Sequence, residues 1–304
     1  MRRVLDWNNV RVGALLAVSI ACGALLPKVV NSSVGVQLHE NLPYCSGGQK
    51  TLLLDVMAPQ ARGTAPRPAL LFVHGGGWQA GNKRDYHELM RGLAAQGAVG
   101  FSVEYRLAPG ATFPAQVEDV KCAVRWIHAH ADEYGIDARR IIAIGGSAGA
   151  YLVAMLGTTA NQPALEGTGG HAAYSSQIHA MVLHGGVFDL TQAFTDPAVN
   201  PGSRQNVMAL LGAKPTDNPR RYSGASPMHH VAANNAPALF IHGDRDPLVP
   251  VGQAVRMHAA LQAAGAKSTL VVVKNGGHAD FGEGAEAARV STAFQSFLAE
   301  HALK

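Results

Sequence analysis

A serine enclosed by glycines is the strongest chemical signal in the sequence. The segment Gly145–Gly149 reads GGSAG, which is a G-x-S-x-G pattern, and it lies between an apolar run at 140–144 and a helical pattern at 148–156. A serine at a tight strand-to-helix turn is strained, so its neighbours must be small. The N-terminus of the following helix favours developing negative charge. The pattern predicts Ser147 as a nucleophile; the alternative is a glycine-rich turn without chemistry.

A second glycine-rich segment, His74–Trp78 (HGGGW), comes directly after the apolar run 69–73. Glycines let backbone N–H groups approach a substrate oxygen closely. Such donors stabilise the oxyanion of a tetrahedral intermediate. A flexible turn is the alternative, but the presence of both motifs directly after apolar runs favours acyl-transfer chemistry at Ser147.

Two later segments could supply the base and the acid. His278 follows the apolar run 269–273, and the segment 242–246 (HGDRD) follows the run 238–241. In the chain order serine, acid, histidine, we expect His278 as the base and Asp246 as the acid. Asp244 is the alternative acid, and its other role would be to form the turn.

Together these residues could carry out nucleophilic catalysis. His278 would take the proton of the Ser147 hydroxyl as it attacks an ester carbonyl, and Asp246 would orient the imidazole. We find neither H-E-x-x-H nor a comparable metal-binding spacing, so we expect no metal and no cofactor.

Alternating strand and helix patterns must position these residues. Apolar runs predict strands, and helical spacing of apolar residues predicts helices. This alternation predicts an α/β fold with a mostly parallel sheet covered by helices on both faces. The strands are expected at 51–57, 69–73, 98–104, 140–144, 180–183, 238–241 and 269–273, and the helices at 86–96, 114–134, 148–156, 251–264 and 285–299.

Length and composition are consistent with one catalytic domain over 31–304. The chain has 304 residues, of which 47% are hydrophobic and 15% charged. The alternation fails between 188 and 235, where five prolines occur, so we expect a small cap insertion there. The net charge of +4 comes mostly from the residues before 31, which leaves about +1 for the rest. We therefore expect no nucleic-acid partner.

The first 30 residues predict an export signal, with basic residues followed by an apolar run at 12–26. We expect an exported protein without stable membrane association once this segment is removed. An uncleaved N-terminal anchor and lipidation of Cys22 are the alternatives. Cys45 and Cys122 then remain, and an exported protein could pair them in a disulfide or bury them as small residues.

The motifs together resemble the α/β-hydrolase superfamily, in the branch of hormone-sensitive-lipase-like and feruloyl- or acetylxylan-esterase-like serine esterases. The resemblance covers about residues 50–300 and rests on HGGGW, GGSAG, GGH and the segments 104–109 (EYRLAP) and 242–250 (HGDRDPLVP). It implies oxyanion donors at Gly76, Gly77 and Ala148. It selects Asp246 over Asp244, because the family's acid lies in an H-G-x-x-D pattern.

Two departures bear on specificity. Hormone-sensitive-lipase-like members usually have a larger N-terminal helical cap and often GDSAG, whereas this chain has a strand-like start and GGSAG. The chain therefore is more similar to small secreted esterases. Trp78 is expected either to line the substrate pocket or to pack in the core.

The sequence thus predicts a serine hydrolase of small acyl or aryl esters, including acetyl or feruloyl esters of plant polysaccharide. An arylformamidase-like amide hydrolase is one alternative, because some related enzymes have a similar HGG-x-W loop. A prolyl-oligopeptidase-type peptidase would need another large domain. A non-catalytic binding protein on the same scaffold is the alternative from another class, although all three triad positions are filled.

Overall fold

The computed structural model describes residues 35–302 except 62, 64 and 161. The expected export signal at 1–30, with Cys22, lies outside the described residues. Within the described part of the chain, no helix is long and apolar enough to cross a membrane.

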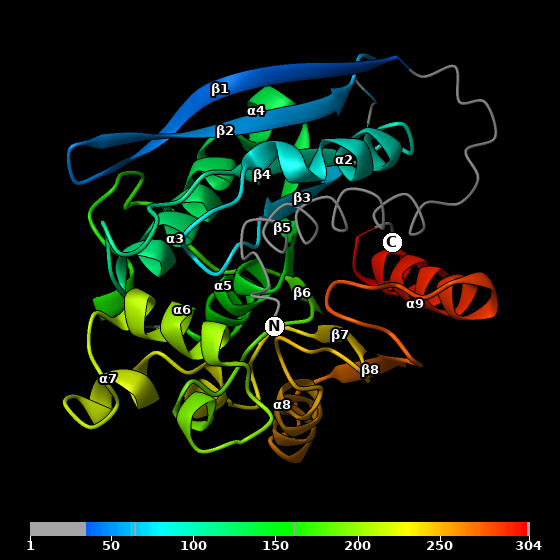
Figure 1. Cartoon of the computed structure of the whole chain (residues 1–304). Coiled ribbons are helices and arrows are strands. Elements are labelled where there is room, and N and C mark those ends of the chain that lie inside the picture. The colour runs from blue at the N-terminus through cyan, green and yellow to red at the C-terminus, as the bar shows by residue number, and fades with distance from the viewer. Residues whose placement is uncertain (1–34, 62, 64, 161, 303–304) are drawn as a thin grey trace, which may run out of the picture.

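An eight-stranded sheet forms the centre of the molecule (Figure 1), in the order β1-β2-β4-β3-β5-β6-β7-β8. Strands β3 to β8 are parallel, whereas β1 and β2 join the edge as an antiparallel hairpin. This arrangement confirms the predicted mostly parallel sheet. The strands are β1 Val36–Gly47, β2 Lys50–Pro59, β3 Arg67–Val73, β4 Val99–Val103, β5 Ile136–Gly146, β6 Ala180–His184, β7 Ala238–Gly243 and β8 Ser268–Val273.

The edge strand β1 pairs irregularly with β2. Its register shifts between His39 and Leu42 and again between Pro43 and Cys45. The sequence indicated a strand-like start, but the hairpin pairing itself was not predicted.

Helices cover both faces of the sheet. Alternate side chains of β3 belong to different cores: Leu71 belongs to the core that contains side chains of α3, α5 and α8, and Leu70 belongs to the core that contains side chains of α2 and α9. A strand that is buried on both faces has a continuous apolar sequence, which is why the sequence predicted β3. The main helices are α2 His87–Ala94, α3 Ala115–Ala129, α4 Ala131–Tyr134, α5 Ala148–Thr158, α8 Gly252–Ala263 and α9 Gly284–His301, with short 3-10 turns η2 Lys83–Tyr86 and η3 Pro163–Leu165.

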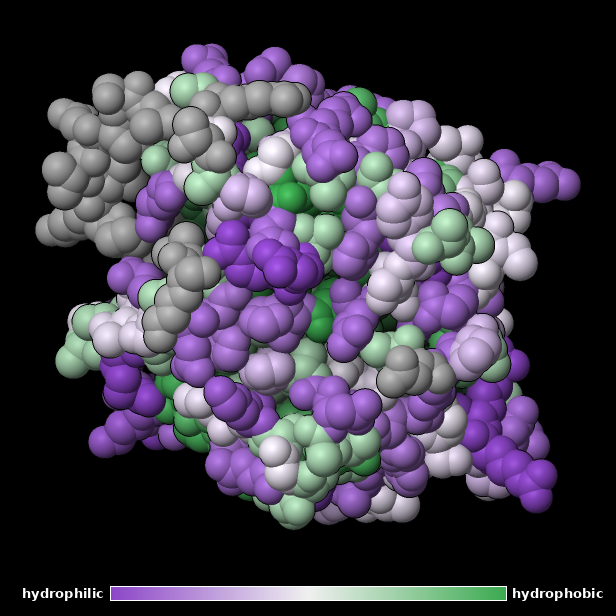
Figure 2. All heavy atoms as spheres, turned by 180° about the vertical axis from the view of Figure 1, so that it is seen from behind, coloured by the Kyte–Doolittle hydropathy of each residue, from purple (hydrophilic) through white to green (hydrophobic). Residues whose placement is uncertain are grey.

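The surface opposite the view of Figure 1 is largely hydrophilic, with hydrophobic residues scattered among polar ones (Figure 2). Among the described residues, the exposed large hydrophobic side chains are Leu38, Tyr174 and Val255. Most apolar side chains of the described residues are therefore buried in the two cores on either face of the sheet.

The single helix expected over 114–134 is wrong at one point, because the chain leaves helical geometry at His130. The His130 backbone has φ −108° and ψ 18°, and α4 then forms only one turn. The His130 ring Nδ1 lies 2.8 Å from the Trp126 carbonyl oxygen, which the His130 N–H also approaches at 3.1 Å. Helical spacing of apolar residues does not reveal such a local bond.

The stretch expected as a cap, 188–235, contains four short helices: η4 Thr191–Phe194, α6 Pro201–Leu211, α7 Pro219–Gly224 and η5 Pro227–His230. Helix α6 begins where the Asn200 side chain accepts a hydrogen bond from the Gly202 N–H, with Pro201 at the first helical position. It ends at Gly212 in the left-handed conformation, with φ 64°. An Asn-Pro start and a glycine end are signals that a sequence analysis could have used.

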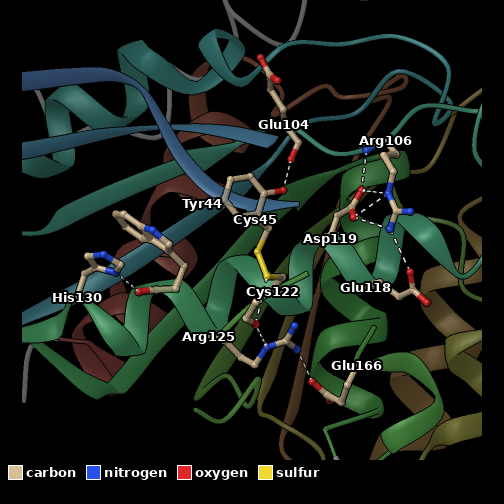
Figure 3. Close-up of a disulfide and its surroundings, with 12 residues drawn as sticks. Tyr44, Cys45, Glu104, Arg106, Glu118, Asp119, Cys122, Arg125, His130 and Glu166 are labelled. Atoms are coloured by element: carbon tan, nitrogen blue, oxygen red, sulfur yellow. Dashed lines mark hydrogen bonds and ion pairs between the residues drawn. A yellow bond between two sulfur atoms is a disulfide. The ribbon is translucent and has the colours of Figure 1, made fainter. Parts of the chain in front are cut away.

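Cys45 and Cys122 form a disulfide that ties β1 to α3, with a Cα–Cα distance of 6.3 Å. Figure 3 shows this bond among charged pairs on α3, including Arg125 with Glu166 at 2.6 Å. The bond closes a sequence separation of 77 residues.

Two histidines near the carboxyl ends of the strands are buried in the neutral form. Burial lowers the pKa of His74 to about 4 and that of His184 to about 3. Both side chains lie against the loops that surround Ser147, so their charge state affects the stability of that end of the sheet.

Removing the disulfide should destabilise the protein without changing the fold. Closing a long loop restricts the unfolded chain, so the double variant Cys45→Ser/Cys122→Ser should lose about 2–4 kcal/mol in the free energy of unfolding. Urea unfolding of the oxidised protein and the variant measures this, and the reduced protein should behave like the variant. Equal urea midpoints for the oxidised protein, the reduced protein and the double variant would contradict the prediction.

The buried histidines should make stability fall as the pH decreases. The unfolded chain takes up these protons near a pKa of about 6.5, and the folded protein does so only at about 4 and about 3. The unfolded state therefore binds more protons below about pH 6.5, and each histidine can contribute up to about 1.4 kcal/mol per pH unit.

Urea unfolding at about pH 7, 6 and 5 tests this pH dependence. His184→Gln should reduce the change of the unfolding free energy with pH by the contribution of one histidine. Substitution of the exposed His229 by Gln should leave this pH dependence unchanged. A wild-type unfolding free energy that does not change over this range would disprove the explanation.

Candidate active site

Ser147 occupies a strained turn between β5 and α5. Its backbone has φ 55° and ψ −119°, which is unfavourable for a residue with a side chain. The Ser147 N–H donates a 2.7 Å hydrogen bond to the His184 carbonyl oxygen of the neighbouring strand β6. This bond and the packing of the turn maintain the strained conformation.

Close contacts with backbone atoms require glycine at positions 145 and 149, on either side of Ser147. A Cβ at Gly145 would lie 2.5 Å from the carbonyl carbon of Gly149, and a Cβ at Gly149 would overlap the carbonyl oxygen of Val73. The turn therefore packs directly on β5 and β3, with room only for hydrogen at these positions.

The loop Gly75–Trp78 lies beside the serine. A Cβ at Gly75 would be 3.4 Å from the Ser147 Cβ. Gly76 and Gly77 have φ values of +105° and +60°, which favour glycine. Within the described residues, no group accepts a hydrogen bond from the backbone N–H of Gly76, Gly77 or Ala148. These three donors thus remain available to a substrate oxygen.

Aromatic contacts hold this loop in place. The rings of His74 and Tyr105 are stacked, with centroids 4.3 Å apart, and the Tyr105 hydroxyl donates to the His74 carbonyl oxygen at 3.0 Å. Next in the chain, Arg106 binds Asp119 of α3, with Nε 2.9 Å from both carboxylate oxygens (Figure 3). Residues 105 and 106 therefore connect the glycine loop to the core.

The structure brings His278 and Asp246 together. The His278 Nδ1 lies 2.7 Å from the Asp246 Oδ2, and the carboxylate is completely buried. The other oxygen, Oδ1, accepts hydrogen bonds from the N–H groups of Leu248 and Val249 at 2.8 and 2.9 Å. Both oxygens are therefore satisfied, and the carboxylate has a fixed orientation.

Burial disfavours the charge on Asp246, but hydrogen bonds outweigh it. His242 Nε2 lies 3.3 Å from Oδ2, and together with His278 and the Val249 N–H it holds the pKa of this carboxyl below its ordinary value. Asp246 therefore remains ionised and can stabilise a protonated His278.

Asp244, the alternative acid, is exposed on the same loop. Its N–H donates to the Val273 carbonyl oxygen, and among the described residues no hydrogen bond joins its side chain to His278. The geometry favours Asp246, two residues further on.

One cavity of about 610 Å³ contains the candidate groups. Ser147, His278, Ala148 and the loop Gly75–Trp78 all line it. Trp78 is both a lining residue and a packed one, because it is 3% exposed and its ring meets Tyr151 edge-on at 5.1 Å. A nucleophile, an oriented base and free N–H donors around one cavity can carry out acyl transfer.

Helix α6 contributes residues that the sequence did not indicate. The Ser203 hydroxyl donates to the Leu248 carbonyl oxygen at 2.8 Å, and the Asn206 Oδ1 accepts from Gln79 Nε2 at 2.7 Å. The helix thereby contacts both the loop that holds Asp246 and the residue that follows the loop Gly75–Trp78. These contacts join residues more than 40 positions apart, so no local pattern identifies them.

Glu40, Asp55 and His87 offer ligand atoms within 4.8 Å of one another. The Lys83 ammonium lies 3.4 Å from Asp55, and His87 Nε2 lies 2.9 Å from the same carboxylate. The buried Asp55 therefore already has cationic and hydrogen-bonding partners, and this cluster is explained as an ion-pair network.

Comparison with known proteins agrees with this geometry. Residues 54–261 match the model of the BD-FAE family. Esterase LipQ of Mycobacterium tuberculosis is 33% identical over 262 residues, which cover 85% of this chain and 61% of the relative. Ethyl acetate hydrolase of Pseudomonas putida is 33% identical, over 67% of this chain and 63% of that protein. The chain thus spans about three fifths of the length of these relatives.

Solved structures show the same architecture. A truncated carbohydrate esterase from gut microbiota superposes with a TM-score of 0.76 and 26% identity, covering 90% of this chain and 99% of that one. Esterase Est2 of Thermogutta terrifontis with bound propionate has a TM-score of 0.70 and 26% identity, covering 90% and 96%. With its mostly parallel sheet, its strained serine turn and these matches, the chain belongs to the BD-FAE family and has the α/β-hydrolase fold.

Proposed function

We propose that the protein is a serine carboxylic-ester hydrolase that acts on small acyl or aryl esters. The observation that carries the proposal is the set of groups around one cavity: Ser147 on its strained turn, and His278 bound to the buried Asp246. The esterase names of the relatives and structural neighbours support the same reaction.

In the proposed mechanism, His278 Nε2 takes the Ser147 hydroxyl proton while Oγ attacks the ester carbonyl carbon. Nδ1 donates to Asp246, which stabilises the imidazolium. The carbonyl oxygen becomes an oxyanion, and the N–H groups of Gly76, Gly77 and Ala148 are its donors. His278 then returns the proton to the leaving alcohol. In the second half of the reaction, His278 takes a proton from water as the water oxygen attacks the acyl carbonyl, and it gives that proton to Ser147 Oγ as the bond between Oγ and the acyl carbon breaks.

The position of Ala148 adds an electrostatic contribution. It is the first residue of the 11-residue helix α5, so its N–H lies at the positive end of the helix dipole. A negative charge that develops beside Ser147 is favoured there over the neutral ground state, which lowers the barrier.

We further propose acyl groups on polysaccharide as substrates and an exported location. The similarity to a carbohydrate esterase supports the first. The second is supported by the N-terminal pattern and by the Cys45–Cys122 bond, because structural disulfides persist in oxidising compartments. The inserted segment 188–235, whose helix α6 lines the cavity, would act as a cap that shapes access to it.

Ser147→Ala should abolish ester hydrolysis, with kcat reduced by a factor of about 10⁴ or more. The test compares wild type and variant on p-nitrophenyl esters of increasing acyl length, methyl ferulate, acetylated xylan and N-formylkynurenine. Wild-type activity on the formamide but on none of the esters would replace the ester proposal with an amidase.

Asp246→Asn should lower kcat by about 10⁴ because the amide cannot stabilise the imidazolium in the same way. Asp244→Asn is the matched control on the same loop and should stay within about twofold of wild type. A larger loss from Asp244→Asn than from Asp246→Asn would overturn the assignment of the acid.

A further inference from the structure

One residue at the end of β6 contacts both the serine turn and the loop that holds His278. The backbone carbonyl oxygen of His184 accepts the 2.7 Å hydrogen bond from the Ser147 N–H. The ring of the same residue reaches the other loop, where its Nε2 lies 3.3 Å from the Asp280 carbonyl oxygen. His184 therefore connects the turn of the nucleophile with the loop of the base.

The bond to Asp280 fixes the position of the proton on the His184 ring. Burial lowers the pKa of His184 to about 3, so the ring is neutral at ordinary pH and has a single N–H group. A carbonyl oxygen only accepts hydrogen bonds, so this proton lies on Nε2, which donates to Asp280. The ring also stacks on Phe281, with centroids 4.1 Å apart. The imidazole thus holds two successive residues of the loop.

The loop needs such support because its backbone is unfavourable next to the base. Ala279, which directly follows His278, has φ +58°, in the left-handed region that residues with a side chain rarely adopt. The Asp280 carboxylate closes the turn, because it accepts hydrogen bonds from the N–H groups of Gly277 and Gly282 at 3.2 and 2.7 Å. A strained turn of this kind keeps its shape only while the surrounding contacts persist.

The end of β6 also lies directly against the pair of His278 and Asp246. The residue after His184 is Gly185, which has φ +57°. A Cβ at Gly185 would lie 3.5 Å from His278 Nδ1 and 3.7 Å from Asp246 Oδ2. A shift of the loop relative to β6 would therefore move the His278 ring relative to Ser147.

We propose that His184 is a positioning residue for the proposed ester hydrolysis, because its ring holds the His278 loop in reach of Ser147. The inference rests on that proposed function and deepens it, since it adds a residue that acts through the base. Proton transfer requires donor and acceptor within hydrogen-bond distance. A misplacement of about 1 Å can lower the rate by about 100-fold.

Two substitutions at His184 that differ in their hydrogen-bond donor test the proposal. His184→Phe keeps a ring beside Phe281 but has no N–H, so kcat for p-nitrophenyl acetate should fall by about 10-fold to 100-fold, with KM within about threefold of wild type. His184→Gln should keep kcat within about threefold of wild type, because its amide nitrogen can replace Nε2 as the donor. Wild-type kcat in His184→Phe, or an equal loss in both variants, would overturn the proposal.

His301→Phe is the matched control for the loss of a buried histidine. His301 has the same 8% exposure as His184, its ring lies 4.5 Å from that of Phe297, and it is not among the described residues that line the cavity. Its substitution should lower the free energy of unfolding but keep kcat within about twofold of wild type. A loss of kcat as large as that in His184→Phe would overturn the assignment.

A double variant shows whether His184 acts through His278. In His278→Ala the base is absent, so the addition of His184→Phe should change the residual hydrolysis of p-nitrophenyl acetate by less than about twofold. A further loss as large as the one measured with His278 present would mean that His184 acts on another part of the site, and the proposal would then be wrong.

The same measurements separate this proposal from the ester hydrolysis on which it rests. If wild type hydrolyses the acetyl ester, Ser147→Ala does not, and His184→Phe matches wild type, the positioning role is wrong and the esterase proposal stands. If wild type hydrolyses no ester, both are wrong.

Should His184→Phe fail to fold, His184→Asn replaces it in the comparison. The shorter amide places its nitrogen near the position of Nδ1 and away from Asp280, so kcat should again fall relative to His184→Gln. Equal kcat values for the Asn and Gln variants would overturn the proposal.

Discussion

The strained backbone of Ser147 is the constraint on which the rest of the site depends. A left-handed φ at a residue with a side chain persists only if the surroundings hold it. Here the Ser147 N–H is bound to β6, and Gly145 and Gly149 pack against backbone atoms with no space for a Cβ. The central strands β3, β5 and β6 must therefore keep their spacing for the serine to face the cavity.

The parallel arrangement explains why distant segments meet. The carboxyl ends of β3, β5, β7 and β8 lie at one edge, so the loops that follow them surround a common space. The glycine loop follows β3, the Ser147 turn follows β5, and the loops that hold Asp246 and His278 follow β7 and β8. This is also why the sequence could single out these residues as candidates: each motif comes immediately after an apolar run that is recognisable by itself.

Other parts depend on contacts that no local pattern encodes. The His130 ring bonds the Trp126 carbonyl oxygen at the point where the helix breaks, and the contact of His242 with Asp246 depends on the turn of the loop that joins them. The α6 contacts with Leu248 and Gln79 need the complete packing of the segment 188–235 against the loops of the sheet. Sequence periodicity identifies which side chains are buried, but it does not show where packed walls leave a space.

The irregular pairing of β1 has a consequence for the behaviour of the protein in concentrated solution. An edge strand with regular pairing offers a row of free N–H and C=O groups to another chain, which promotes aggregation. The two register shifts of β1 interrupt that row, and Pro43 lacks an N–H altogether. With Cys45 fixed to α3, the strand also cannot easily separate from the sheet and pair with another molecule. These features of the first strand thus disfavour strand exchange with another chain.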